Sequence, residues 1–374
     1  MNLLVPVFLL KIIFVLPLKM LFYTLDLLLV RRSCNFRLKL IGRIAMREAL
    51  NLSYIQSFKD VINPAFDWLN GFFLKNSNEE EIFYECTDTD LKMLPNIKSL
   101  GEVNAKINWF RKPVDFNPKT DSIILYFHGG GFATKLIPST LFFLQNLSRF
   151  FPRTAIVIQD YTTTASGKDT DKYPRQLIES VAAYSHLSQN VSCSNIILMG
   201  ESAGGNLVLA LLQYLIRRDI NMPIKAVAIS PWCNPMSYSD EELTLYKDCE
   251  RIDSISFSGL KRFTELLHPT SSHFNPLDPL LNIEACFDEK TWKIILSQVD
   301  LLVTYGTEEI LKHQIAKFIN KLENIQCEKF NLANNVLLDE GGSHIEPALI
   351  ISRDLSNWSR YKTVSRILAM LDRK

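Results

Sequence analysis

Two glycine-rich segments hold residue types that could together carry out nucleophilic attack on a carbonyl carbon. The first is His128-Gly129-Gly130-Gly131-Phe132, and the second is Gly200-Glu201-Ser202-Ala203-Gly204-Gly205. The second segment fits G-x-S-x-G, in which a sharp turn between a strand and a helix exposes a serine hydroxyl. The first has three successive glycines, whose N–H groups can point at a substrate oxygen because no side chains shield them. A nucleophile and the donors for a developing oxyanion serve one reaction, so the pair is more specific than either segment alone.

The sequence around Ser202 supplies the strand and the helix that such a turn requires. Residues 195–199 form a short apolar run typical of a strand buried on both faces, and residues 206–216 are typical of a buried helix. Gly200 and Gly204 are the small residues that let the strand and the helix approach closely. The alternative is a chance match to a common pattern, and the strand-turn-helix context disfavours it. We therefore predict that Ser202 is the nucleophile.

The upstream glycine segment also follows an apolar strand pattern, at residues 122–127. The predicted oxyanion donors are the backbone N–H groups of Gly129, Gly130, Gly131 and Ala203. The alternative is a flexible loop without a catalytic role. His128 is expected to shape this loop rather than to act as a base, because it adjoins the oxyanion site and lies early in the chain.

The order of these parts is that of the α/β-hydrolase fold, in which the acid and the histidine follow the serine. The chain has six histidines: His128, His186, His268, His273, His313 and His344. Only His344 lies in a late turn after a predicted strand, where Gly341 and Gly342 give the loop freedom to present the ring. We therefore predict that His344 is the general base.

The acid should follow a buried strand that the sequence predicts at residues 299–305. Glu308 and Glu309 both lie in the turn after it and could orient the imidazole. One of the two could instead be a carboxylate favoured at a helix N-terminus. Asp300 stands at the beginning of this strand and is therefore expected at its wrong end. From position alone, the choice between the two glutamates stays open.

With these motifs the chain resembles the hormone-sensitive-lipase branch of the α/β-hydrolases, over roughly residues 85 to 374. Further matching motifs are Asp160-Tyr161, Tyr173-Pro174 and Ser230-Pro231-Trp232. The resemblance implies a mostly parallel central sheet flanked by helices, with a helical cap, and no metal or organic cofactor. In this family the acid stands three residues after a glycine, which from Gly306 indicates Glu309 rather than Glu308.

The chain departs from that family pattern at Thr162-Thr163-Thr164-Ala165-Ser166-Gly167, and its acid is a glutamate beside another glutamate. These features, together with the apolar N-terminus, make it similar to the fungal steryl acetyl hydrolase group. This resemblance implies a hydrophobic ester substrate, in particular an acetylated sterol, and a catalytic domain in the lumen of the endoplasmic reticulum.

The composition fits one catalytic domain with an N-terminal appendage. We expect a membrane anchor at 1–32, a helical linker or cap segment at 33–84, and a catalytic domain at 85–374 with a cap insertion at about 234–290. The 374 residues have a formal net charge of +1, which does not suggest a nucleic-acid partner, and no obligatory protein partner is evident. The seven cysteines show no C-x-x-C spacing, so neither a zinc site nor a redox site is expected.

Residues 3–30 are overwhelmingly apolar and exceed the roughly 20 residues that span a bilayer. A cleaved signal peptide, an anchor lying in the plane of the membrane and a buried soluble helix are the alternatives. The in-plane anchor is considered because Lys11 and Lys19 would be costly in the middle of a bilayer.

Two patterns in the sequence give opposite predictions for the side of the membrane on which the catalytic domain lies. Basic residues follow the apolar segment at Arg31, Arg32, Arg37, Lys39 and Arg43, and would favour the cytosol. Four sequons permit a lumenal domain: Asn51, Asn146, Asn190 and Asn357. With the resemblance, we expect the endoplasmic reticulum membrane and a lumenal domain.

Together these features predict a membrane-anchored serine esterase that acts on a hydrophobic small-molecule ester. Ser202 would attack the ester carbonyl, His344 would move the proton, and Glu309 would orient His344. The alternatives are a catalytically silent binding protein on the same scaffold and an acyltransferase that uses the same triad.

Overall fold

The protein is described from a computed structural model, which covers residues 4–28, 34–94, 97, 100, 102–236, 244, 249–269, 275 and 277–373. Part of the predicted cap insertion, including His273, lies outside these residues, as do Arg31 and Arg32.

Within the described residues, eight strands form one sheet in the order β1-β2-β4-β3-β5-β6-β7-β8. The strands β1 (Asn78–Tyr84) and β2 (Val103–Arg111) are antiparallel to their neighbours, and the other six run parallel to one another. The six parallel strands are β3 Ile123–Phe127, β4 Ala155–Gln159, β5 Ile196–Glu201, β6 Lys225–Ile229, β7 Asp300–Gly306 and β8 Val336–Asp339. The mostly parallel sheet agrees with the fold class that the sequence predicts.

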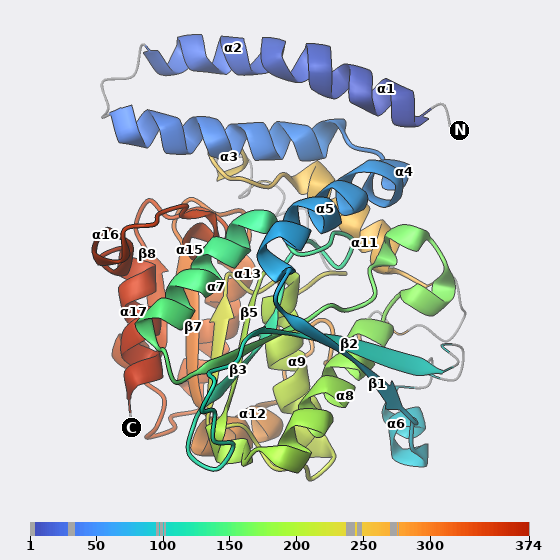
Figure 1. Cartoon of the computed structure of the whole chain (residues 1–374), viewed down its shortest axis with the longest axis vertical. Coiled ribbons are helices and arrows are strands. Elements are labelled where there is room, and N and C mark those ends of the chain that lie inside the picture. Colours follow the sequence, from blue (N-terminus) through green and yellow to red (C-terminus); the bar gives the residue numbers. More distant parts are fainter. Residues whose placement is uncertain are drawn as a thin grey trace.

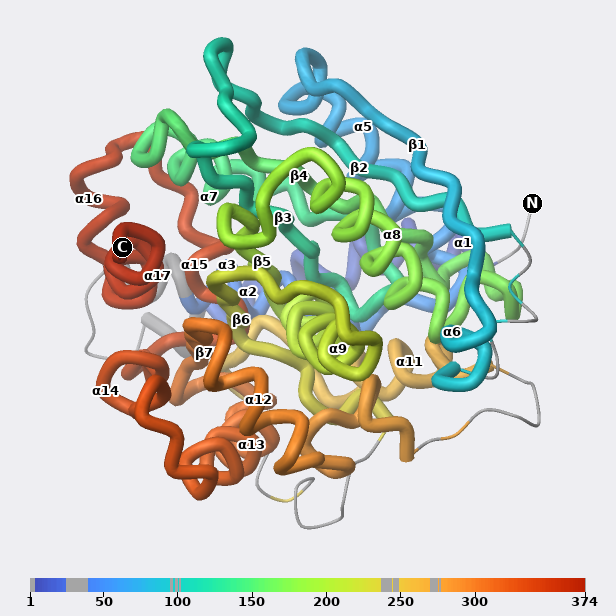
Figure 2. Tube along the Cα trace, turned by 90° about the horizontal axis from the view of Figure 1, so that it is seen from below, coloured from blue at the N-terminus to red at the C-terminus, as the bar shows by residue number. Residues whose placement is uncertain are grey.

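Helices cover both faces of this sheet (Figures 1 and 2). One face carries α8 (Arg175–Asn190), α9 (Ala203–Arg217), α12 (Glu289–Gln298) and α13 (Lys312–Asn324). The other face carries α7 Pro138–Phe150, α16 Leu355–Ser359 and α17 Lys362–Asp372. Three shorter helices lie in the segments that connect these elements: α6 Asp88–Met93, α14 Leu332–Asn335 and α15 Glu346–Leu349.

Strand β3 shows why both faces are apolar. Ile123, Leu125 and Phe127 pack into the core beneath α8 and α9, whereas Ile124 and Tyr126 pack into the core beneath α7 and α17. Successive side chains of a strand point to opposite faces, so a strand covered on both faces is a continuous apolar run.

A layer of helices lies over the end of the sheet at which the parallel strands finish (Figure 1). The N-terminal helix consists of α1 (Leu4–Leu10), a π-helical turn (Lys11–Val15) and α2 (Leu16–Leu28), and it runs alongside α3 (Cys34–Leu52). The layer continues with α4 Ile55–Ser57, a π-helical turn Phe58–Ile62, α5 Asn63–Leu74 and α11 Phe257–Leu267. Among the described residues, the segment Leu4–Thr24 is the helix long and apolar enough to cross a membrane.

Candidate active site

Ser202 stands on the sharp turn between β5 and α9, where the sequence predicts it. Its backbone has φ 56° and ψ −117°, a strained conformation for a residue with a side chain. The turn is held by a hydrogen bond from the Ser202 N–H to the Ile229 carbonyl, 2.9 Å long. A Cβ atom on Gly204 would overlap the carbonyl of Phe127 at the end of β3, so only glycine lets α9 approach this neighbouring strand so closely.

His344 lies in the loop after β8 and meets Ser202 across the site. The imidazole Nε2 is 2.8 Å from the Ser202 Oγ, although the two residues are 142 positions apart. Both side chains are buried. This contact is the one through which a base removes the hydroxyl proton of a serine nucleophile.

Glu309 approaches the other nitrogen of the same ring. Its Oε2 accepts hydrogen bonds from the Ser230 hydroxyl at 2.6 Å and from the Gly306 N–H at 3.0 Å. Its Oε1 is 4.0 Å from the His344 Nδ1, and neither of these two buried atoms has a hydrogen-bond partner among the described residues. The carboxylate is therefore held by one oxygen and directed at the imidazole by the other.

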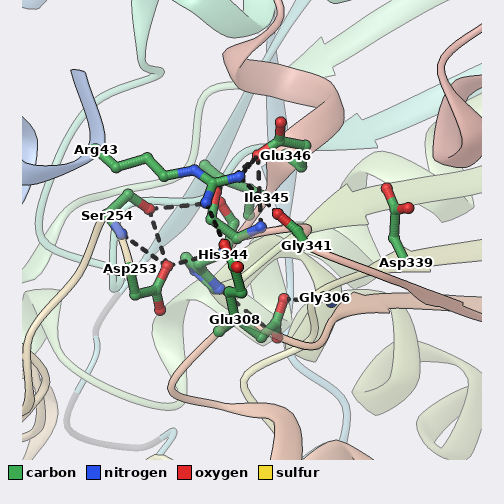
Figure 3. Close-up of polar contacts among 12 residues, drawn as sticks. Arg43, Asp253, Ser254, Gly306, Glu308, Asp339, Gly341, His344, Ile345 and Glu346 are labelled. Carbon is green, nitrogen blue, oxygen red and sulfur yellow. Dashed lines mark hydrogen bonds and ion pairs between the residues drawn. The ribbon is translucent and has the colours of Figure 1, made fainter. Parts of the chain in front are cut away.

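Glu308 has a different environment, although it is the next residue. Its carboxylate forms an ion pair with Arg43 of α3 at 2.7 Å and stays partly exposed. Arg43 also contacts the Glu346 carboxylate at 2.8 Å and the Gly341 carbonyl at 3.0 Å (Figure 3). Of the two acids that the sequence leaves open, Glu309 is the one that faces His344, and Glu308 links the turn to α3.

One predicted oxyanion donor needs correction. The Gly129 N–H donates to the Glu201 Oε1 at 3.0 Å, so it is not available to a substrate oxygen. The Glu201 carboxylate also accepts from the Tyr126 hydroxyl and, at 3.1 Å, from the Thr140 hydroxyl. Glu201 therefore fixes the position of Gly129, the first glycine of the loop.

The remaining predicted donors are free to face a substrate. Gly130 and Gly131 have φ of 104° and 59°, a region that favours glycine, and their N–H groups meet no acceptor among the described residues. Ala203 is the first residue of α9, where the backbone N–H has no partner within the helix. These three N–H groups are the candidates for an oxyanion hole.

His128 lies beneath the same loop and not in the reacting centre. Its ring stacks on Tyr161 with 4.0 Å between centroids, and its Nδ1 contacts the Gly129 carbonyl at 2.7 Å. Burial lowers the pKa of His128 to about 4, so the ring is neutral at pH 7. The Tyr161 hydroxyl donates to the His128 carbonyl at 2.9 Å. These contacts fit a loop-shaping residue.

Asp253 is a buried carboxylate of the site that sequence reasoning missed (Figure 3). Its Oδ1 accepts from the backbone N–H groups of His344 at 2.9 Å and of Ser254 at 2.7 Å, and its Oδ2 accepts from the Ile310 N–H at 2.8 Å. Burial raises its pKa to about 6, against the lowering effect of His344 and with a further increase from Glu309. Asp253 thus connects the predicted cap insertion to the loops that carry His344 and Glu309.

The reacting groups open into an apolar cavity. Ser202, His344 and Gly130 lie among its lining residues, and the overlying helices supply apolar walls: Phe8 from α1, Leu50 from α3, Phe66 from α5 and Phe263 from α11. Such a lining suits an apolar molecule with few polar groups. No group of three or more histidine, cysteine or carboxylate side chains suited to a metal ion occurs in the part of the chain that the structure describes.

Comparisons with known proteins agree with this geometry. A family model described as steryl acetyl hydrolase matches residues 6–370. Steryl acetyl hydrolase 1 of Saccharomyces cerevisiae is 34% identical over 274 residues, which cover 72% of this chain and 64% of that protein. The chain thus spans just under two thirds of that relative. The putative steryl acetyl hydrolase mug81 of Schizosaccharomyces pombe is 26% identical over 323 residues, covering 83% of this chain and 81% of that protein.

Solved structures show the same fold. An esterase from the bacterial hormone-sensitive lipase family superposes with a TM-score of 0.61 at 19% identity, covering 91% of this chain and 99% of that one. Brefeldin A esterase, a bacterial homologue of human hormone-sensitive lipase, superposes with a TM-score of 0.59 at 13% identity, covering 85% of each chain. At these identities the structures support the fold alone.

Proposed function

The chain belongs to the steryl acetyl hydrolase family, and on this basis we propose that it is a serine carboxylic-ester hydrolase that removes the acetyl group from acetylated sterols or similar hydrophobic esters. The predicted family and the predicted α/β-hydrolase fold are confirmed. The observation that carries the proposed activity is the 2.8 Å contact between the His344 Nε2 and the Ser202 Oγ, beneath an apolar cavity.

The proposed mechanism begins with proton transfer from the Ser202 hydroxyl to His344 as the oxygen attacks the ester carbonyl. The N–H groups of Gly130, Gly131 and Ala203 would stabilise the oxyanion that forms. His344 then protonates the leaving alkoxide of the sterol, which departs as the alcohol. A water molecule, deprotonated by His344, then attacks the acyl-enzyme. The bond between the acetyl carbon and the Ser202 oxygen breaks, acetate leaves, and His344 returns the proton to Ser202.

Two negative groups would stabilise the imidazolium that forms in each step. Glu309 faces the Nδ1 of His344, and Asp253 holds the backbone of the same residue. A carboxylate in the first position sets the tautomer and the orientation of the ring. These steps need only the side chains described, the backbone donors and water.

The assembled Ser202–His344 contact argues against a catalytically silent binding protein. Acyl transfer to an alcohol would use the same triad, because only the acceptor differs. The two reactions are distinguished by their products: hydrolysis releases acetate, whereas transfer forms a new ester.

A direct test uses the full-length protein in detergent micelles with a steryl acetate. We expect release of free sterol and acetate in equal amounts, and no release from Ser202→Ala. A steryl oleate, which differs only in its acyl chain, tests whether the acetyl group is preferred. Hydrolysis of p-nitrophenyl acetate without hydrolysis of the steryl acetate would reject the proposed substrate class and keep the esterase chemistry.

We further propose that the protein works at the endoplasmic reticulum membrane with its catalytic domain in the lumen. Of the four sequons, Asn190 and Asn357 are exposed, whereas Asn146 is buried. In a lumenal domain we expect glycans at the two exposed positions, detected as a mobility shift that an endoglycosidase removes. The double change Asn190→Gln with Asn357→Gln should abolish that shift. A chain without any such shift in its native cell would contradict the lumenal location.

A further inference from the structure

The N-terminal helix lies alongside α3 (Figure 1), and α2 contacts α3. Met20 and Tyr23 pack against Leu40 and Ile44 of α3 in a small apolar cluster. Helix α3 in turn is fixed to the catalytic domain, since Arg43 pairs with Glu308 and Glu346. The N-terminal helix is therefore laid across the domain and does not project away from it.

Both lysines of this helix face the domain. Lys19 forms an ion pair with Glu48 at 2.6 Å, where the Glu48 side chain is almost fully buried. Lys11 donates to the Tyr54 hydroxyl and lies 4.5 Å from the centroid of the same ring. The two charges that would be costly in hydrocarbon are thus placed against α3 and the residues next to α4.

The opposite face of the helix is apolar and uncovered. Leu10, Ile13, Phe14, Leu18 and Phe22 are each more than half exposed. The segment Leu4–Thr24 has 21 residues with a mean hydropathy of 2.3 in its most apolar window, of which only 6% is buried. A helix with an apolar outer face and with Lys11 and Lys19 directed at the domain is suited to lie in a membrane interface rather than to cross the bilayer.

The inner face of the same helix reaches the active-site cavity. Phe8 of α1 is 4% exposed and lines the cavity that also contains Ser202 and His344. The Phe66 side chain of α5 and the Leu50 side chain of α3 lie in the same lining. The N-terminal helix therefore has an apolar outer face and, through Phe8, also forms part of the wall of the cavity that contains Ser202 and His344.

We propose that the N-terminal helix lies flat in one leaflet of a lipid bilayer and that the ester enters the cavity directly from that leaflet, past Phe8. A span would separate the helix from α3 and place Lys11 and Lys19 in hydrocarbon without the partners they have here. In the flat arrangement these contacts are kept, and a hydrophobic ester moves from acyl chains to an apolar cavity without crossing water. The route of entry rests on the proposed function, whereas the orientation of the helix does not.

The orientation is tested by depth-dependent quenching in phosphatidylcholine vesicles. A fluorophore is attached to the full-length chain at Leu10→Cys, Phe14→Cys, Leu18→Cys or Phe22→Cys, and lipids carry a quencher at a shallow or a deep position. The wild-type chain, treated in the same way, gives the background from its native cysteines, and Met20→Cys on the inner face is the matched control.

A flat helix places all four outer positions at the same shallow depth and leaves Met20→Cys unquenched by lipid. A depth that changes steadily along the helix would show a span and overturn the proposal. Absence of lipid quenching at every position would overturn it as well.

The route of entry is tested with Phe8→Trp and Phe8→Ala, using a steryl acetate in vesicles and water-soluble p-nitrophenyl acetate. Phe8→Trp places a larger side chain in the cavity wall and should lower the ratio of steryl acetate turnover to p-nitrophenyl acetate turnover about tenfold. Phe8→Ala, with a smaller side chain, should raise this ratio. Phe83→Trp, on the exposed side chain of β1, is the control and should leave both turnovers unchanged. An unchanged ratio in both Phe8 variants would overturn the route. A wild-type chain that hydrolyses neither ester would instead reject the proposed function, while the quenching result stands.

Discussion

The Oε1 atom of Glu309 lies 4.0 Å from the Nδ1 atom of His344, and both atoms are buried without another hydrogen-bond partner among the described residues. An approach of about 1 Å would form the charge-assisted hydrogen bond typical of a catalytic acid and its histidine. Catalytic hydrogen bonds are often long before substrate binds and tighten afterwards. Ser230 and Gly306 hold the other oxygen of Glu309, so the carboxylate is already positioned beside the ring. A small rotation of the carboxylate or of the ring would then bring Oε1 and Nδ1 within hydrogen-bond distance.

Glu309→Gln should lower kcat by about 10⁴-fold, since the amide would present an N–H₂ group to the Nδ1 and favour the wrong tautomer. Glu308→Gln is the matched control, because it makes the same chemical change one residue away, at an ion pair with Arg43. We expect it to cost less than about tenfold, as partly exposed ion pairs contribute little. Steady-state kinetics of both variants decide the matter, and the reverse ranking would assign the acid to Glu308.

Asp253→Asn should lower kcat by about 10–100-fold with little change in KM, because one backbone N–H would then face an amide N–H₂. A purely structural role would not move the pH profile. Loss of this negative charge disfavours the imidazolium, so the acid limb of the kcat/KM profile should move to lower pH. Arg251→Ala, on an exposed side chain of the same segment, should change neither quantity. An Asp253→Asn enzyme with a wild-type profile would show that Asp253 has no electrostatic effect on the base.

Glu201→Gln should reduce kcat more than it raises KM. The Glu201 carboxylate accepts three hydrogen bonds, from Gly129, Tyr126 and Thr140, and an amide has only one oxygen to accept them. A loosened glycine loop misplaces the oxyanion donors, and the loss of one donor costs about 2.7–4 kcal/mol in the transition state. We expect a smaller loss, of about 1–2 kcal/mol, because the donors themselves remain. A rise in KM with unchanged kcat would show that the loop serves only substrate binding.

The contribution of Glu201 and Asp253 to the stability of the fold should fall as the pH rises from about 4 to about 7, whereas His128, whose pKa burial lowers from 6.5 to about 4, contributes in the opposite direction. Burial raises the pKa of Glu201 to about 7 and that of Asp253 to about 6, above their ordinary values of 4.5 and 3.8. Between the ordinary and the raised values each of these two carboxyl groups binds more protons in the folded chain than in the unfolded chain, so its contribution to the free energy of unfolding decreases with pH. Thermal unfolding in detergent is measured across this range for the wild type and for Glu201→Gln, and the pH dependence of the variant should lack the downward contribution of Glu201. A slope that is the same in the variant would contradict the assignment to Glu201.

Much of the arrangement of the proposed catalytic residues could be predicted because it depends on local patterns. Ser202 lies where an apolar strand, a small-residue turn and an apolar helix follow one another, and His344 is the histidine in a late glycine turn. Both elements are set by nearby sequence, and the chain order of the parts limits the topology.

Other features depend on contacts between distant segments, which no local pattern reveals. Gly129, Gly130 and Gly131 are equivalent in sequence, and only the fold places Glu201 against the N–H of the first. Asp253 lies in a polar stretch that is typical of a surface, yet it is buried against His344 and Ile310.

The N-terminal segment illustrates the same limit. Its composition predicts membrane association but does not separate a span from an in-plane anchor. That distinction depends on where Lys11 and Lys19 point, and their partners Tyr54 and Glu48 belong to a part of the chain tens of residues further on.

The most direct test of the account is covalent labelling of the full-length protein by a fluorophosphonate, read by mass spectrometry, alongside turnover of a steryl acetate. We predict one adduct, on Ser202, and that Ser202→Ala loses both the adduct and about 10⁶-fold in kcat. Ser297→Ala, on an exposed serine of α12, should keep both. Labelling and steryl acetate turnover that persist in Ser202→Ala would contradict the account, because another residue would then be the nucleophile.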